Sequence, residues 1–334
     1  MMFELNTLQN VWIILIAVLW VGYFVLEGFD FGVGILLPVI GKNEAEKRTL
    51  MTTLGPLWDG NEVWLLVAGG ATFAAFPEWY ATLFSGFYLP LFLILVALII
   101  RGVAFEYRSK HGDVMWRSRW DKAIVVGSFI PALLWGVAFA NLARGVEIEV
   151  LSSGGFVYTG GFFALLNPFA LLGGLVTLTL FMTHGAIFIS LKTDGEIRYR
   201  ARKIALQLGL VATVLAVTFL LWGQLAYSNN TWTWIPVGIA AVSWLVGLFA
   251  MAKGREGFSF TASALTLAMA VATIIGWMYP NVMPHIDRSQ TGLTIYNASS
   301  TEMTLKIMTI VALVMTPIVL LYQGWTYWVF RKRL

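Results

Sequence analysis

Long apolar segments separated by short polar connections fill almost the whole chain. A helix needs about 20 mostly apolar residues to cross the hydrocarbon core of a membrane. We therefore expect nine transmembrane helices, at residues 10–38, 51–76, 80–106, 122–143, 162–191, 204–226, 234–252, 258–279 and 304–330. Helices joined by short connections pack as antiparallel neighbours. Residues 1–334 are thus predicted to form a single polytopic membrane domain of the all-α class.

Basic residues alternate between the two sets of connections. Most Lys and Arg residues lie in one set, at residues 39–50, 107–122, 192–203 and 253–257 and in the segment after 330. The opposite side contains only Arg144, Arg288 and Lys306. Because basic residues accumulate on the cytoplasmic side, the pattern predicts an outside N-terminus and a cytoplasmic C-terminus. That orientation requires an odd number of spans, which nine satisfies.

The composition supports a membrane protein and excludes several kinds of site. Charged residues make up 12% of the chain and mean hydropathy is +0.76, whereas soluble domains contain about 25% charged residues. The absence of Cys excludes disulfides, iron–sulfur clusters and thiolate ligands. Three His residues leave little room for a metal site, and we expect none. The basic residues lie between apolar segments, so they do not indicate nucleic-acid binding. Glu4, without a basic stretch before the first span, argues against a cleaved signal peptide.

Two acids lie deep within the second predicted span. Asp59 and Glu62 are three residues apart and share one helix face. Counting about 1.5 Å per residue from Met51 places them about 12 and 17 Å inside a core about 30 Å thick. Charge at that depth costs about 2.5–3.5 kcal/mol, so it indicates a functional site. Trp58 lies too deep for an interfacial anchor, and Pro56 predicts a kink. The alternative is a buried cluster that only fixes helix packing.

The first span contains a second pair of acids with the same spacing. Glu27 and Asp30 lie on one helix face, toward the predicted cytoplasmic end. Gly28 and Gly32 form a small-xxx-small pair, which lets another helix approach closely. The alternative is that these acids reach for the interface or cap a kink.

Arg101, in the third span, is the natural counter-ion for one of these acids. Its span runs inward, which places the guanidinium at a comparable depth. Four acids against one Arg leave surplus carboxylates, and we expect these to exchange protons at neutral pH because burial disfavours their charge. A series of such acids is what a proton path needs.

His184 is the only His within a predicted span. A haem held by two His ligands would need a second deep His. We therefore favour hydrogen bonding or proton relay over haem ligation at His184, with simple packing as the alternative.

The residues alone leave two functional classes open. One is a proton-conducting subunit of a redox complex, and the other is a proton-coupled secondary transporter. Transporters commonly show inverted repeats with matched broken helices in their two halves. The acids here lie in the first three spans and have no counterpart later in the chain, which favours the redox subunit.

Several segments occur in the order found in one known family. The most specific are Glu27-Gly28-Phe29-Asp30-Phe31-Gly32-Val33-Gly34 and Trp58-Asp59-Gly60-Asn61-Glu62-Val63-Trp64. Further segments lie at residues 68–71, 84–88, 105–110, 127–129, 136–139 and 166–169. On these segments the chain resembles subunit II of the cytochrome bd-type quinol oxidases over nearly its whole length.

The resemblance implies two four-helix bundles plus one peripheral helix in a bacterial cell membrane. It implies a heterodimer with subunit I, which carries two b-type haems (b558 and b595), one haem d and the quinol site; some complexes add a small accessory subunit. In this family the complex oxidises quinol with proton release outside and reduces O2 to water with protons from inside, generating a proton motive force. Subunit II binds no catalytic haem, supports assembly and lends acids to the proton path. Some relatives hold a structural quinone in it.

The resemblance carries over to individual residues only in part. Asp59 matches the family acid on the proton route into subunit I, and Asp30 matches a second shared acid. Glu27 stands where an acid is usual, and Trp64 stands near a proposed oxygen route. We therefore predict no catalytic residue in this chain. The predicted proton pathway consists of Asp59, Asp30, Glu27 and Glu62, with Arg101, Trp58, Trp64 and His184 in support.

Two positions depart from some family members. Glu62 stands where some relatives have Gln, so a charge at this position is not essential to the mechanism. His184 also replaces Gln in some members, which weakens haem ligation by this residue further.

Overall fold

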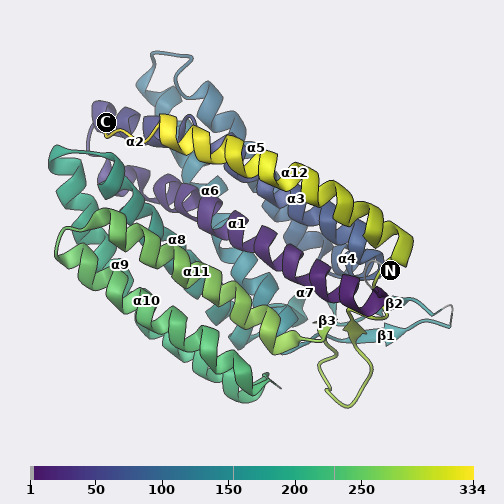
Figure 1. Ribbon diagram of the computed structural model, residues 1–334. Coiled ribbons are helices and arrows are strands. Elements are labelled where there is room, and N and C mark those ends of the chain that lie inside the picture. The colour runs from purple at the N-terminus through teal and green to yellow at the C-terminus, as the bar shows by residue number, and fades with distance from the viewer. Residues whose placement is uncertain (1–3, 153, 229) are drawn as a thin grey trace.

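The computed structural model describes residues 4–152, 154–228 and 230–334, which fold mainly into long helices (Figure 1). The first six helices are α1 (Leu5–Ile40), α2 (Glu44–Leu54), α3 (Trp58–Ala75), α4 (Pro77–Gly86), α5 (Tyr88–Tyr107) and α6 (Val114–Arg144). The others are α7 (Gly161–Ala164), α8 (Pro168–Lys192), α9 (Gly195–Ala226), α10 (Trp234–Ala252), α11 (Glu256–Met278) and α12 (Glu302–Val329), with a short 3-10 helix at Thr231–Thr233.

Eight of the described helices are long and apolar enough to cross a membrane: α1, α5, α6, α8, α9, α10, α11 and α12. The predicted span at 51–76 is the one that has no counterpart among these eight helices. It is not a single helix, because α2 ends at Leu54 and α3 begins at Trp58. Pro56 lies in the break and lacks the N–H that a continuous helix would need. The disruption predicted at Pro56 is therefore confirmed, and it is a break between two helices rather than a bend within one.

Two other predicted spans are also divided. The segment at 80–106 separates at Phe87 into α4 and α5. The segment at 162–191 contains α7 and then α8, whose N-cap Asn167 accepts a hydrogen bond from the backbone N–H of Ala170. Pro168 is the first residue of α8, where a missing N–H has no cost. Asn167-Pro168 therefore begins a new helix and does not form a kink within one helix.

The helices pack in two groups. In the first group α1 contacts α3 and α6, and α5 packs on α6; in the second, α8 packs on α9 and α10 on α11. α1 and α6 also pack on α8, which joins the groups. Large buried aromatic side chains fill the first group: Trp20 lies 5.0 Å from Trp135 and 4.9 Å from Phe139 between ring centroids.

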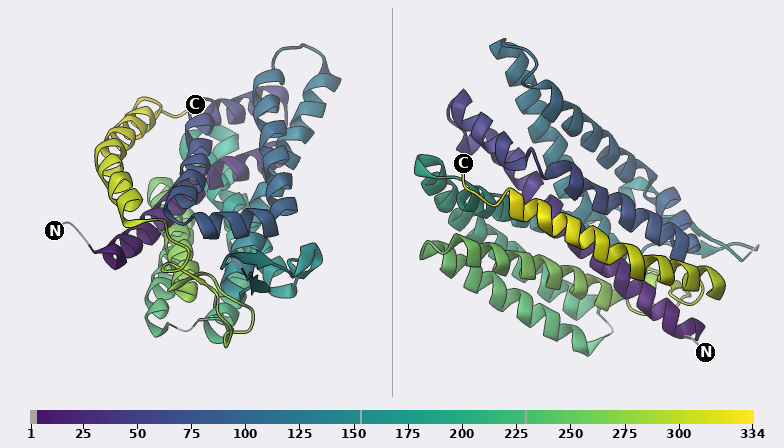
Figure 2. Two further views of the ribbon diagram at one scale, coloured as in Figure 1. Left: turned by 90° about the vertical axis from the view of Figure 1, so that its right-hand side faces the viewer. Right: turned by 45° about the horizontal axis from the view of Figure 1, so that its top comes forward.

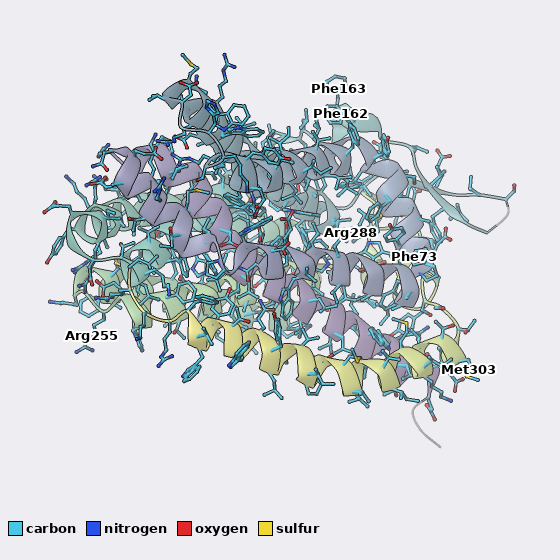
Figure 3. The ribbon with its side chains drawn as sticks, turned by 90° about the horizontal axis from the view of Figure 1, so that it is seen from above. Phe73, Phe162, Phe163, Arg255, Arg288 and Met303 are labelled. Carbon is cyan, nitrogen blue, oxygen red and sulfur yellow. The ribbon has the colours of Figure 1, made fainter. Side chains whose placement is uncertain are left out.

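Two small antiparallel strand pairs modify the all-α expectation. β1 (Ile148–Val150) pairs with β2 (Phe156–Tyr158), and β3 (Asn281–Met283) pairs with β4 (Leu293–Thr294). The first pair forms in the connection after α6, and the second forms in the connection between α11 and α12. The guanidinium of Arg288 donates there to the carbonyls of Ala143, Arg144 and Tyr227 at 2.8–3.3 Å, satisfying the C-terminal ends of α6 and α9. Figure 3 shows Met303 and Arg288 far from Arg255, which lies at the other end of the molecule.

α12 lies on the outside of the molecule: it is at one side in the left view of Figure 2 and in front of the other helices in the right view. Leu305 is its one buried residue among those described. Trp12 of α1 donates a hydrogen bond from its indole N–H toward Thr309 at 3.1 Å. Few apolar contacts therefore hold α12, and polar contacts contribute much of its attachment.

Candidate functional site: a buried charge cluster

A buried ion pair joins α1 to α5. A guanidinium nitrogen of Arg101 contacts a carboxylate oxygen of Glu27, and both side chains are fully buried. Phe31 and Phe105 flank the guanidinium, with ring centroids 4.7 and 5.3 Å from its central carbon. Arg101 is thus the counter-ion that the sequence predicted, and its partner is Glu27. The hypothesis that Glu27 reaches for the interface was wrong, because this side chain is enclosed by helices.

Asp30 lies fully buried one helical turn from Glu27. Its Oδ2 accepts a hydrogen bond of 2.8 Å from the side-chain amide of Asn61, on α3. The amide oxygen of Asn61 accepts hydrogen bonds from Tyr327 at 2.8 Å and Gln323 at 3.2 Å, both on α12. The amide therefore links the acids of α1 to the peripheral helix.

The two acids of α3 have different surroundings. Glu62 is about one-quarter exposed and lies 4.0 Å from the guanidinium of Arg101, at the edge of the cluster. Asp59 is exposed and forms no ion pair or side-chain hydrogen bond with the residues that the structure describes. The buried cluster thus comprises Glu27, Asp30 and Arg101 with Glu62 beside them, while Asp59 lies outside it. The alternative that Asp59 belongs to a buried cluster that only fixes packing was wrong.

A groove opens at the break between α2 and α3. Its walls include Arg48, Pro56, Trp58 and Glu106, from α2, the break, α3 and α5. Trp58, which precedes Asp59 in the chain, lines this groove, whereas Asp59 itself does not. Trp58 is half-buried, and its ring centroid lies 5.1 Å from that of Phe105. Because Phe105 also flanks Arg101, this groove lies one aromatic layer from the buried ion pair.

Close helix packing places the acids of α1 where they are. A Cβ atom on Gly32 would collide with the backbone of Phe181 and Gly185 in α8, and a Cβ on Gly28 would collide with the Phe181 ring. The predicted close approach of a second helix to Gly28 and Gly32 is therefore confirmed. Another face of α1, at Gly22, receives the half-buried ring of Trp64.

His184 is fully buried between α1, α8 and α11. Its Nε2 lies 3.1 Å from the carbonyl oxygen of Val25, which can only accept, so Nε2 carries the proton. Its Nδ1 lies 2.7 Å from the Ser263 hydroxyl, within hydrogen-bond distance. Both ring nitrogens are thus engaged, and His184 does not fit an axial haem ligand. Among the described residues, no group of His, Asp and Glu is arranged to hold a metal ion.

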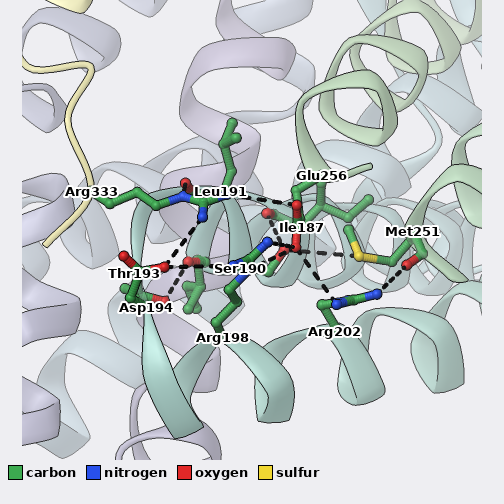
Figure 4. A network of polar contacts seen from close by, with 11 residues as sticks. Ile187, Ser190, Leu191, Thr193, Asp194, Arg198, Arg202, Met251, Glu256 and Arg333 are labelled. Atoms are coloured by element: carbon green, nitrogen blue, oxygen red, sulfur yellow. Dashed lines mark hydrogen bonds and ion pairs between the residues drawn. The ribbon is translucent and has the colours of Figure 1, made fainter. Parts of the chain in front are cut away.

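Ion pairs gather where the predicted cytoplasmic connections meet. Figure 4 shows Arg333, beyond α12, pointing toward Asp194 and Glu256, with Nη1 3.2 Å from the Asp194 carboxylate. Arg198 pairs with Glu256 at 2.9 Å. A second group joins α2 to its neighbours through Lys47–Asp121, Arg108–Glu44, Arg108–Asp121 and Arg200–Glu46. These connections share one end of the molecule, as the distribution of basic residues predicted.

The pair between Glu46 and Arg200 should give a small, pH-dependent stabilisation. Hydrogen bonds from Arg200 hold the pKa of Glu46 at about 2, below its ordinary 4.5. A depressed pKa stabilises the folded state fully above pH 4.5, and the stabilisation disappears as the pH falls toward 2. Because the pair is partly solvated, Glu46→Gln should cost about 0–1 kcal/mol at pH 7.

Thermal unfolding of the purified wild type and Glu46→Gln variant, followed from pH 7 to pH 3, checks this expectation. The difference between their midpoints should be constant down to about pH 4.5 and then shrink. A difference that grows on acidification would contradict it.

Sequence reasoning missed three members of the site. Asn61 was noted only as an amide in a motif, and Gln323 and Tyr327 were not noticed. The sequence did contain a sign of a polar site in this span, because Gln323 and Tyr327 are polar residues four apart on one face of an apolar helix. No sequence pattern, however, connects them to Asn61.

The fold and the cluster together define a polytopic helical membrane protein with a buried charge cluster between its first helices. Comparison with known proteins then narrows the class. The family model described as cytochrome bd terminal oxidase subunit II matches residues 8–330. The chain belongs to this family and is a multi-pass bacterial membrane protein.

Curated relatives match over almost their full length. The chain is 38% identical to "Cytochrome bd-I ubiquinol oxidase subunit 2" of Escherichia coli K12, covering 98% of this chain and 95% of the relative. It is 40% identical to "Cytochrome bd ubiquinol oxidase subunit 2" of Bacillus subtilis, covering 98% and 97%. A chain of the bd oxidase structure from Geobacillus thermodenitrificans superposes with a TM-score of 0.76 at 18% identity, covering 96% and 98%. That likeness establishes the shared fold.

Proposed function

We propose that this chain is the subunit II of a quinol:O2 oxidoreductase, in which it supports assembly with a haem-bearing subunit I and contributes acids to proton uptake from the cytoplasm. Cytochrome bd subunits II work in a complex with subunit I, and the family implies haem cofactors in that complex. The two b-type haems, the haem d and the quinol site are assigned to subunit I. His184 supports this division, because neither of its ring nitrogens is free.

One observation carries the proposal: Asp59 is an exposed carboxylate on a helix that packs within a membrane bundle. An ionisable side chain facing lipid is costly, and such residues normally face a protein interior or a water-filled cavity. A partner subunit that covers this face of α3 removes the cost. The apolar side chains Val63, Leu66 and Val67 are also exposed there. We infer that subunit I covers this face and receives protons from Asp59.

The cluster suits proton transfer because its acids outnumber its cations. Within reach of Arg101 lie Glu27 and Glu62, and Asp30 lies one turn from Glu27. A proton that enters through the groove at the break reaches Asp59, while Glu62, Glu27 and Asp30 form a reserve of exchangeable sites behind it. The haems in subunit I would supply electron transfer to O2, and the acids of this chain would supply the protons that balance those electrons. Uptake inside and quinol proton release outside together generate the proton motive force.

The proposal includes the architecture and the orientation. We infer nine spans, with α2 and α3 together forming the ninth, arranged as two four-helix bundles with α12 peripheral. The packing of α1, α3, α5 and α6 and of α8 to α11 supports this arrangement. The N-terminus is outside and the C-terminus cytoplasmic.

Purification tests the function directly. The tagged chain, expressed in its native membrane and extracted in detergent, should co-purify with a larger second subunit. The extract should show b- and d-type haem absorption and consume O2 when quinol is added. A colourless monomer that transports a solute would instead support the proton-coupled secondary transporter and exclude the oxidase.

A further inference from the structure

A chain of hydrogen bonds runs from Trp64 to Asp30 and crosses α12 on the way. The indole N–H of Trp64 donates to Oε1 of Gln323 at 3.2 Å. Nε2 of Gln323 donates to Oδ1 of Asn61 at 3.2 Å, and Nδ2 of Asn61 donates to Oδ2 of Asp30 at 2.8 Å. All four side chains are buried or partly buried. Each of the two amides, Gln323 and Asn61, is therefore hydrogen-bonded through both its oxygen and its NH2 group.

The direction of this chain is set at both ends. Nδ2 of Asn61 also donates to the carbonyl oxygen of Leu26 at 3.4 Å, which fixes the orientation of that amide. An indole N–H can only donate, so the oxygen of the Gln323 amide must face Trp64. The NH2 group of Gln323 then faces Asn61, which turns the Asn61 oxygen toward it. The NH2 group of Asn61 is left facing Asp30. A hydroxyl can donate or accept, so Tyr327, which also bonds the Asn61 oxygen, does not set the direction.

This direction determines which oxygen of the Asp30 carboxylate can carry a proton. Oδ2 of Asp30 faces a group that can only donate, so no proton can sit between Oδ2 and Asn61. Oδ1 is buried and has no hydrogen-bond partner among the described residues. A neutral Asp30 must therefore carry its proton on Oδ1.

We propose that Trp64, Gln323 and Asn61 form a directional relay that positions Asp30 and restricts proton exchange to its Oδ1. These are positioning residues, since none of them transfers the proton itself. The proposal rests on the proposed function, in which Asp30 belongs to the proton pathway. It gives α12 a role in the chemistry of the first helices.

A purely structural reading is that Gln323 only anchors α12. The chain offers a matched control, because α12 is also bonded near its other end, where Thr309 accepts from the Trp12 indole at 3.1 Å. Thr309→Val removes that bond without touching the relay, and leaves only the longer bond of 3.3 Å from the same indole N–H to the Leu305 carbonyl. Gln323→Met keeps the length of the side chain and removes both relay bonds.

The experiment measures quinol oxidase turnover against pH in the purified two-subunit complex, at equal haem content. Gln323→Met should lower kcat about twofold to twelvefold, the range that loss of a hydrogen bond of about 0.5–1.5 kcal/mol gives. The acid limb of its pH profile should shift, because the Asn61 amide that donates to the Asp30 carboxylate loses one of its supports. Tyr327→Phe should have a smaller effect, and Thr309→Val should leave both kcat and the pH profile unchanged.

Three outcomes would overturn the relay. If Gln323→Met has normal turnover and an unshifted pH profile while Asp59→Asn is impaired, the relay is wrong and the proton pathway stands. If Thr309→Val reproduces the effect of Gln323→Met, the role is anchoring of α12. If neither Asp59→Asn nor Gln323→Met changes turnover, the proposed proton pathway fails together with the relay.

Discussion

Asp59→Asn is expected to leave the complex assembled with its full haem content and to lower quinol-dependent O2 consumption by about 10²-fold, the low end of the range for a positioned proton-transfer group. Asp59 is exposed and makes no side-chain hydrogen bond with the described residues, so the isosteric amide removes no internal contact. The amide cannot carry the proton, and electron transfer to the haems then lacks its balancing charge.

O2 consumption with added quinol, normalised to haem absorbance, provides the measurement. Glu147→Gln is a suitable control, because Glu147 is also an exposed acid but lies at the opposite end of the molecule, beside β1. It should behave as wild type. A haem-replete Asp59→Asn complex that turns over normally would show that protons do not pass through this residue. Loss of haem with normal activity per remaining haem would indicate a packing role instead.

Arg101→Met should prevent accumulation of the assembled complex. The substitution leaves the carboxylate of Glu27 fully buried without its counter-ion. Removing one partner of a buried pair costs about 3–5 kcal/mol, whereas replacing both partners by neutral groups is often tolerated. The double variant Glu27→Gln with Arg101→Met should therefore recover much of the assembly that the single variant loses.

Yield and thermal stability of the haem-containing complex distinguish these variants. Arg117→Met is a matched control, because Arg117 forms a partly exposed pair with Glu44 at 3.7 Å; it should cost about 0–1 kcal/mol. Wild-type stability in the Arg101→Met variant would mean that the ion pair does not hold α1 against α5. A double variant that is no more stable than the single one would contradict the explanation by unpaired charge.

Much of the fold was predictable because the length and spacing of apolar segments depend only on the membrane core. Eight helices fall where hydropathy places them. The divided helices were harder, since Phe87 carries no breaking signal of its own. The strand pairs were not predicted, because strands of two or three residues give no alternating pattern long enough to detect.

The candidate site was predictable in its composition and less so in its arrangement. Helical spacing placed Glu27 with Asp30 and Asp59 with Glu62, and the single deep cation identified Arg101. The rotation of each helix about its axis decides which acid faces inward, and spacing alone does not fix it. As a result, Glu62 faces Arg101, although some relatives have Gln at this position, and Asp59 faces outward. Whether the four acids conduct protons remains a prediction.

The hydrogen bonds from α12 to Asn61 have a consequence for how the protein is made. Gln323 lies 262 residues after Asn61 in the chain, so α12 is synthesised after every other described helix. Until it arrives, the Asn61 oxygen in the newly inserted helices lacks both of its partners from α12, and an unsatisfied polar group is costly inside a bilayer. The charge cluster of the first helices is thus completed by the last one, and biogenesis of the site ends only when the peripheral helix is in place.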